Sequence, residues 1–84
     1  MNIFVSNLGD NITDASLEAI FSTHGTVNST EVVYDQVTGF SRGFAFVQMP
    51  HEVEAANTIK RLDGAVINGR SIVVKEAGEL SNEK

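Results

Sequence analysis

The sequence predicts one α+β domain of the ferredoxin-like type, a sandwich in which two helices cover one face of a four-stranded antiparallel sheet. First, the chain has 84 residues, 42% of them hydrophobic, which allows one small core. Second, segments typical of strands and of helices follow one another in the order β-α-β-β-α-β. In the split β-α-β arrangement with this order, the second face of the sheet carries no helix.

The first strand and the first helix are predicted from alternation and from helix signals. In NIFVSNL, Ile3 and Val5 share one face of a strand, and Phe4 stands on the other. The helix is expected to follow Thr13 as its N-cap and to stop at Gly25, with apolar residues at helical spacing between them.

The second and third strands are predicted to form a hairpin. TVNSTEVVYD, residues 26–35, is rich in β-branched residues, and RGFAFVQM, residues 42–49, follows a turn-prone loop around Gly39. Two strands joined by such a loop are typical of an antiparallel pair.

The second helix and the last strand complete the order. Pro50 ends the third strand, and the second helix is expected to stop at Gly64. An Asn-Gly turn then precedes a last strand in which Ile72 and Val74 alternate with Ser71, Val73 and Lys75. The domain is predicted to span residues 1–78, and residues 79–84 are expected to form a short flexible tail.

The polar residues of RGFAFVQM indicate which way its phenylalanines point. Arg42, Phe44, Phe46 and Gln48 share one face if the strand is regular. Burying Arg42 and Gln48 under the helices without partners would be costly, so this set is expected to face outward together with Phe4. The alternative is that the phenylalanines line the buried core. An exposed apolar surface of this size normally marks a binding site.

Two segments carry a resemblance to a known family. IFVSNL and RGFAFVQM resemble the hexamer and octamer ribonucleoprotein motifs of the RNA recognition motif family, in their usual order. The resemblance extends over roughly residues 2–77, and the chain is similar to the small single-domain members found in bacteria. It implies a partner, single-stranded RNA, with single-stranded DNA as a weaker ligand.

The resemblance also implies roles for individual residues. Phe4 and Phe46 fall at base-stacking positions, Phe44 at the aromatic that contacts sugars, and Arg42 at the basic position that meets a phosphate. Three further residues fall where members often hydrogen-bond base edges: Ser6, Gln48 and Lys75. Phe40 stands where many members have a basic residue, and its ring is a candidate to clasp RNA.

The charge balance predicts weak binding. The net charge is −5 and the isoelectric point is near 4.7, the wrong sign for gripping a phosphate backbone by bulk charge. The proposed face itself carries Arg42 and Lys75 against Glu31, which takes an often basic position.

Other classes of function find little support in the sequence. The chain has no cysteine, which excludes disulfides and thiolate zinc sites. His24 and His51 have no nucleophile or ligand cluster at a diagnostic spacing, so we expect no enzyme activity, metal or cofactor. The N-terminal sequence lacks the features of a secretion signal, and no segment is apolar over a membrane-spanning length, so a cytoplasmic protein without a membrane partner is expected.

The sequence thus favours an RNA-binding module, with a role in post-transcriptional RNA regulation or RNA chaperoning. The main alternative is a protein-interaction or self-association module that uses the same aromatic face. Two local alternatives also stay open. Arg42 could pair with Glu31 or Asp35 on the surface, and the ring of Phe40 could pack against the sheet edge or the domain body.

Overall fold

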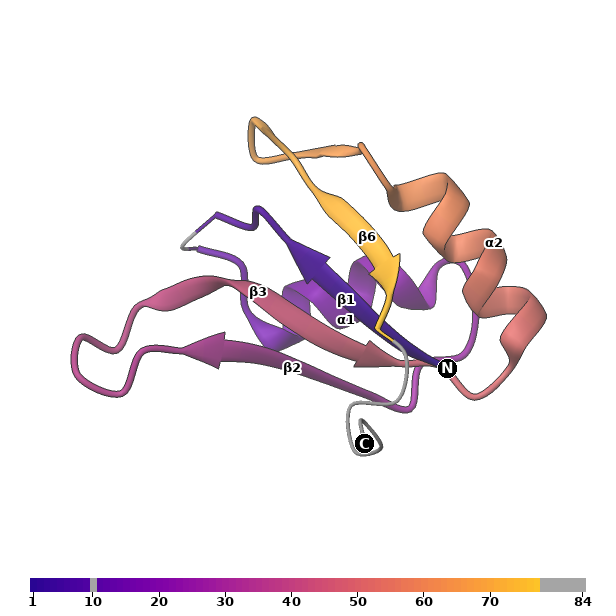
Figure 1. Ribbon diagram of the computed structural model, residues 1–84, viewed down its shortest axis with the longest axis horizontal. Coiled ribbons are helices and arrows are strands. Elements are labelled where there is room, and N and C mark those ends of the chain that lie inside the picture. The colour runs from indigo at the N-terminus through magenta and orange to yellow at the C-terminus, as the bar shows by residue number, and fades with distance from the viewer. Residues whose placement is uncertain (10, 78–84) are drawn as a thin grey trace.

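The strands and helices follow one another in the predicted order, and a short hairpin precedes the last strand (Figure 1). The computed structural model describes residues 1–9 and 11–77. Its elements are β1 (Asn2–Ser6), α1 (Asp14–Ser22), β2 (Ser29–Tyr34), β3 (Ser41–Gln48), α2 (Glu52–Leu62), β4 (Val66–Ile67), β5 (Arg70–Ser71) and β6 (Val73–Glu76). The predicted tail, residues 79–84, lies outside the described residues, as does Gly78 at the expected domain boundary.

The main sheet has the strand order β2-β3-β1-β6, and each neighbouring pair is antiparallel. In Figure 1, α1 passes behind β1 and β3, and α2 lies beside the β6 edge. The helices contact the sheet through α1 with β2 and through α2 with β6. The predicted α+β sandwich is therefore confirmed.

One hydrophobic core lies between the helices and the sheet. Ile3 and Val5 are fully buried and alternate with the partly exposed residues of β1, as a strand with one covered face requires. Leu17 and Phe21 of α1 belong to the same core, four residues apart on one side of the helix. Met49 is also fully buried and belongs to the same core.

Three carboxylates attach the helix layer to strands and loops. Each accepts a hydrogen bond from a backbone N–H group that would otherwise need water or another acceptor. The pairs are Asp14 Oδ1 with Val32 N at 2.7 Å, Glu54 Oε1 with Thr26 N at 2.9 Å, and Asp63 Oδ1 with Val74 N at 3.0 Å.

The predicted start of the first helix is confirmed, and its predicted end is wrong. Thr13 caps α1 by accepting a hydrogen bond from the backbone N–H of Ser16. The helix ends at Ser22, before Gly25. Gly25 is favoured for another reason, because a Cβ atom there would lie 2.9 Å from Glu54 Cβ, which cannot move without its backbone, as well as 2.7 Å from Glu54 Oε1.

The Asn-Gly turn is present, although the strand after it is shorter than predicted. Asn68 and Gly69 have positive φ angles of 53° and 82°, as a tight two-residue hairpin turn needs. They join β4 to β5 in a separate two-stranded sheet. Ser71 therefore belongs to this hairpin, and the last strand of the main sheet begins at Val73.

Candidate functional site

Three phenylalanine side chains meet on one face of the main sheet. Phe4 of β1 lies directly opposite Phe46 of β3, and Phe44 lies opposite Ser6. The ring centroids are 5.5 Å apart for Phe4 and Phe46, 5.6 Å for Phe4 and Phe44, and 6.2 Å for Phe44 and Phe46. Aromatic pairs attract at about 4.5–7 Å, so the rings form one continuous patch, here named the phenylalanine cluster.

The phenylalanine cluster lies on the face opposite the helices. Its three members are partly exposed, whereas the residues that alternate with them in β3, Ala45 and Val47, are 0% and 1% exposed. The outward orientation predicted for the three rings is confirmed. The alternative that they line the buried core is wrong.

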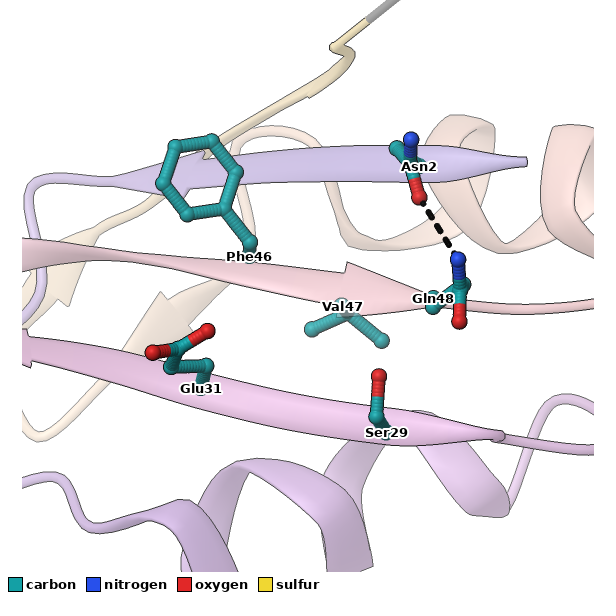
Figure 2. A pocket seen from close by; sticks show the side chains of 6 residues that line it. All are labelled: Asn2, Ser29, Glu31, Phe46, Val47 and Gln48. Atoms are coloured by element: carbon teal, nitrogen blue, oxygen red, sulfur yellow. Dashed lines mark hydrogen bonds between the residues drawn. The ribbon is translucent and has the colours of Figure 1, made fainter. Parts of the chain in front are cut away.

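A first open pocket lies between the phenylalanine cluster and the β2 edge of the sheet (Figure 2). We name it the β2-side pocket. Its volume is about 280 Å³, and its lining residues are Asn2, Ser29, Glu31, Phe46, Val47 and Gln48.

The polar groups of the β2-side pocket come from three adjacent strands. Glu31 pairs with Phe46 in the register of β2 and β3, and Ser29 pairs with Gln48. Gln48 Nε2 donates a hydrogen bond of 3.2 Å to Asn2 Oδ1, shown as the dashed line in Figure 2. Glu31 is exposed, and its carboxylate forms no ion pair with any residue that the structure describes.

A second open pocket lies on the other side of Phe46, toward β6. This β6-side pocket has a volume of about 300 Å³ and is lined by Phe4, Phe46, Lys75, Glu76 and Ala77. Lys75 is exposed and pairs with Phe4 in the register of β1 and β6. The same ring, Phe46, therefore has a carboxylate toward one side and an ammonium group toward the other.

Arg42 lies beyond an irregularity in β3. The pairing of β2 with β3 shifts register between Val32 and Tyr34, and Gly43 has a φ of +87°, which glycine adopts without strain. Arg42 is exposed, and its guanidinium lies 3.4 Å from Asp35 Oδ2, measured from Nη1.

Asp35 organises the loop between β2 and β3. Its Oδ1 accepts backbone hydrogen bonds from Val37 at 2.8 Å and from Thr38 at 3.0 Å. The pKa of the Asp35 carboxyl lies below its ordinary value of 3.8, because these two hydrogen bonds favour the ionised form. The bond from Thr38 has the largest effect and the bond from Val37 the next, and the charge of Arg42 lowers the pKa by a smaller amount. Of the two carboxylates proposed as partners of Arg42, the structure shows Asp35 in contact.

Phe40 belongs to the same loop and lies apart from the phenylalanine cluster. It is 67% exposed, so the alternative that its ring packs against the domain body is wrong. Its backbone N–H donates to Thr38 Oγ1, and its carbonyl accepts from the N–H of Asp35. The loop therefore presents an aromatic ring to solvent.

Sequence reasoning missed Asn2 as a pocket residue. Asn2 precedes Phe4 by two positions, so the same strand alternation, continued by one step, would have placed it on the outer face. Ser29 also lines this pocket, and its pairing with Gln48 depends on the register of β2 and β3, which alternation within one strand does not give.

In the part of the chain that the structure describes, the side chains that could hold a metal ion do not gather into a cluster. Within residues 1–9 and 11–77, no group of three or more His, Asp or Glu side chains could hold a metal ion. Over the same residues, no helix has the length and apolar character needed to cross a membrane.

Known proteins resemble this chain both in sequence and in structure. The profile of the RNA recognition motif family matches residues 3–73. The crystal structure of RNA Binding Protein PG1 superimposes with a TM-score of 0.90 at 40% sequence identity, covering 94% of this chain and 95% of that one.

Two relatives by sequence come from a plant and a bacterium. The chain is 49% identical over 79 residues to the 31 kDa ribonucleoprotein, chloroplastic, of Nicotiana sylvestris, covering 94% of this chain. It spans only 25% of the length of that relative. It is 43% identical over 77 residues to RbpA of Nostoc sp., covering 92% of this chain and 76% of RbpA, which confirms the predicted similarity to small bacterial members.

Proposed function

This chain belongs to the RNA recognition motif family, and on that premise we propose that it binds single-stranded RNA by stacking bases on the phenylalanine cluster. The observation that carries the proposal is the set of three touching, partly exposed rings on the uncovered face of the sheet. The names of two similar proteins, a chloroplast ribonucleoprotein and RNA Binding Protein PG1, support it.

Stacking supplies most of the expected affinity. A base that covers an aromatic ring contributes about 1–3 kcal/mol, measured as the loss on substitution by alanine, whatever the base. The rings are mounted on paired strands and contact one another, so the protein loses little conformational freedom when RNA binds. Two stacked bases then contribute about 2–6 kcal/mol of the roughly 8 kcal/mol that a micromolar affinity requires.

We assign the stacking positions to Phe4 and Phe46 and the sugar contact to Phe44. Ser6, opposite Phe44 in the register, and Lys75, opposite Phe4, are placed to hydrogen-bond base edges beside these rings. Gln48 contributes in the same way from the β2-side pocket.

Two residues of the β2–β3 region complete the proposed RNA interface. Arg42 contacts a phosphate when it leaves Asp35, because a surface ion pair of this kind contributes only about 0–1 kcal/mol. Phe40, exposed on its loop, closes over the RNA strand from the side.

The decisive experiment is a titration of short labelled RNA oligomers against the protein and three variants. We expect Phe46→Ala and Phe44→Ala each to weaken RNA binding by about 5- to 150-fold, the equivalent of 1–3 kcal/mol. Val53→Ala is the matched control, since Val53 is an apolar side chain on α2 that is 74% exposed. Circular dichroism checks that every variant is folded.

The same variants separate RNA binding from the alternative function. Unchanged RNA affinity in folded Phe44→Ala and Phe46→Ala would reject the stacking mechanism. If the protein instead showed a concentration-dependent increase in size that either substitution abolished, the phenylalanine cluster would serve self-association. Turnover of RNA by rigorously purified protein would contradict the proposal that the chain is a binding module and not an enzyme.

We propose a role in post-transcriptional RNA regulation or RNA chaperoning. Discrimination against DNA requires a contact to the 2′-hydroxyl, since stacking cannot detect that group. Competition between RNA and DNA oligomers of the same sequence measures it, with weaker DNA binding expected. A cytoplasmic location stays a prediction, because the relative from Nicotiana sylvestris is a chloroplast protein.

A further inference from the structure

The β2-side pocket lies where the edge of a base stacked on Phe46 would extend. Glu31 is directly opposite Phe46, and adjacent strands are separated by about 4.8 Å. In Figure 2 the Glu31 side chain rises from β2 on the same side of the sheet as the Phe46 ring. A base that covers Phe46 and extends toward β2 therefore brings its edge to the Glu31 carboxylate.

The polar group of this pocket that lies opposite Phe46, the Glu31 carboxylate, accepts hydrogen bonds and donates none. An ionised carboxylate offers two acceptor oxygens and no donor. Gln48 Nε2 is engaged with Asn2 Oδ1, which leaves the Gln48 carbonyl oxygen as a second acceptor group. The remaining donors are the second Nε2 hydrogen of Gln48, the Asn2 amide hydrogens and the hydroxyl of Ser29, which both donates and accepts.

This arrangement distinguishes among the bases. Guanine presents two neighbouring donors on its Watson–Crick edge, the N1–H and the 2-amino group, which together match the two oxygens of one carboxylate. Cytosine and adenine present one amino group beside an acceptor nitrogen. Uracil presents one N–H between two carbonyl oxygens, which the carboxylate repels.

The β6-side pocket provides the internal contrast. There Lys75 supplies an ammonium group, which donates to acceptor edges such as carbonyl oxygens. Glu76 also lines this pocket, but it pairs with the buried Ile3, so its side chain belongs to the helix-covered face of the sheet. A base edge that carries mainly hydrogen-bond donors is therefore bound more tightly on the β2 side of Phe46 than on the β6 side.

From these observations we propose that the β2-side pocket selects guanine, with Glu31 as the specificity-determining residue. The inference rests on the proposed function, because it needs a base stacked on Phe46. Glu31 weakens the general attraction for phosphate, and the inference gives the same residue a specific contact with one base.

The test uses RNA oligomers that carry a single guanosine, moved through every position of a uridine background. At the best position, guanosine is expected to bind roughly ten- to a hundredfold more tightly than uridine, as for a good two-hydrogen-bond contact. Inosine, which lacks the 2-amino group, is expected to lose most of this preference. The 7-deaza analogue keeps the Watson–Crick edge and is expected to retain it.

Glu31→Gln supplies the test on the protein side. We expect it to reduce the preference for guanosine over uridine by about tenfold, since it replaces one acceptor oxygen with a donor. Glu18→Gln is the matched control, because it makes the same charge change at an exposed position of α1 and is expected to leave the preference unchanged.

The outcomes separate the inference from the proposed function. Equal binding of guanosine and uridine oligomers, with both still weakened by Phe46→Ala, would overturn the guanine assignment and leave the stacking interface standing. A preference that survives Glu31→Gln would overturn the role of Glu31. Absence of RNA binding under all conditions would remove the proposed function and the inference with it.

Discussion

The salt dependence of RNA affinity tests how the basic side chains are arranged. On a single strand, each phosphate contact contributes about −0.7 to the slope of log affinity against log salt concentration. Arg42 and Lys75 are the two cations of this face, and one phosphate contact from each, which Lys75 makes in addition to its base-edge contact, predicts a slope of about −1.4. Arg42 must first leave Asp35, and with side chains 54% and 36% exposed and 3.4 Å between them, that pair contributes only about 0–1 kcal/mol. A phosphate can therefore compete for Arg42.

Three charge-removing variants make this prediction specific. Arg42→Gln and Lys75→Gln are each expected to reduce the slope to about −0.7, measured by fluorescence anisotropy between about 50 and 200 mM salt. Lys60→Gln, an exposed position on α2, is the control and is expected to leave the slope unchanged. A wild-type slope steeper than about −3 would show that the phosphate contacts lie elsewhere. An unchanged slope in Arg42→Gln would show that Asp35 keeps Arg42 in the complex.

Three further predictions concern stability and the loop. Thr30 Oγ1 is buried with no hydrogen-bond partner among the described residues, so Thr30→Val is expected to stabilise the fold by about 1 kcal/mol in urea unfolding; a loss of stability would contradict this. Asp14→Ala leaves the N–H of Val32 without its acceptor and is expected to cost about 1–3 kcal/mol, whereas Glu18→Ala should stay within about 0.5 kcal/mol in the same assay. The pKa of Asp35 is lowered in the folded protein, so its support of the loop is present above the ordinary value of 3.8 and is lost as the pH falls through the folded-state pKa. The amide shifts of Val37 and Thr38 in NMR spectra should therefore change below pH 3.8, and constant shifts down to pH 2 would refute it.

The orientation of the phenylalanine cluster could be predicted because it depends on local alternation alone. In β1 and in β3 from Phe44 onward, successive side chains do point to opposite faces, so polar neighbours were sufficient to assign the faces. Which of the two carboxylates Arg42 contacts could not be obtained in this way. The irregularity at Gly43 arises from how β2 and β3 pair, and alternation in one strand contains no information about its partner.

The β2-side pocket is a second feature that alternation along single strands could not predict. Glu31 takes a position that is often basic in the family, and from the sequence alone it predicts only a charge that repels phosphate. Its position opposite Phe46, with Ser29 opposite Gln48, follows from the register of two strands. Likewise, the end of α1 could not be placed at Ser22, because the preference for Gly25 comes from Glu54, a residue distant in the sequence.

The mutual contacts within the phenylalanine cluster imply that its members are energetically coupled. With centroids 5.5–6.2 Å apart, removing one ring takes away a neighbour that orients the other two. Losses of affinity from single and double substitutions in this set should therefore not add, and a double-mutant cycle between Phe4 and Phe46 would give a non-zero interaction energy. To alter what this sheet binds, it would be more effective to exchange the three rings of the phenylalanine cluster together than to replace them one at a time.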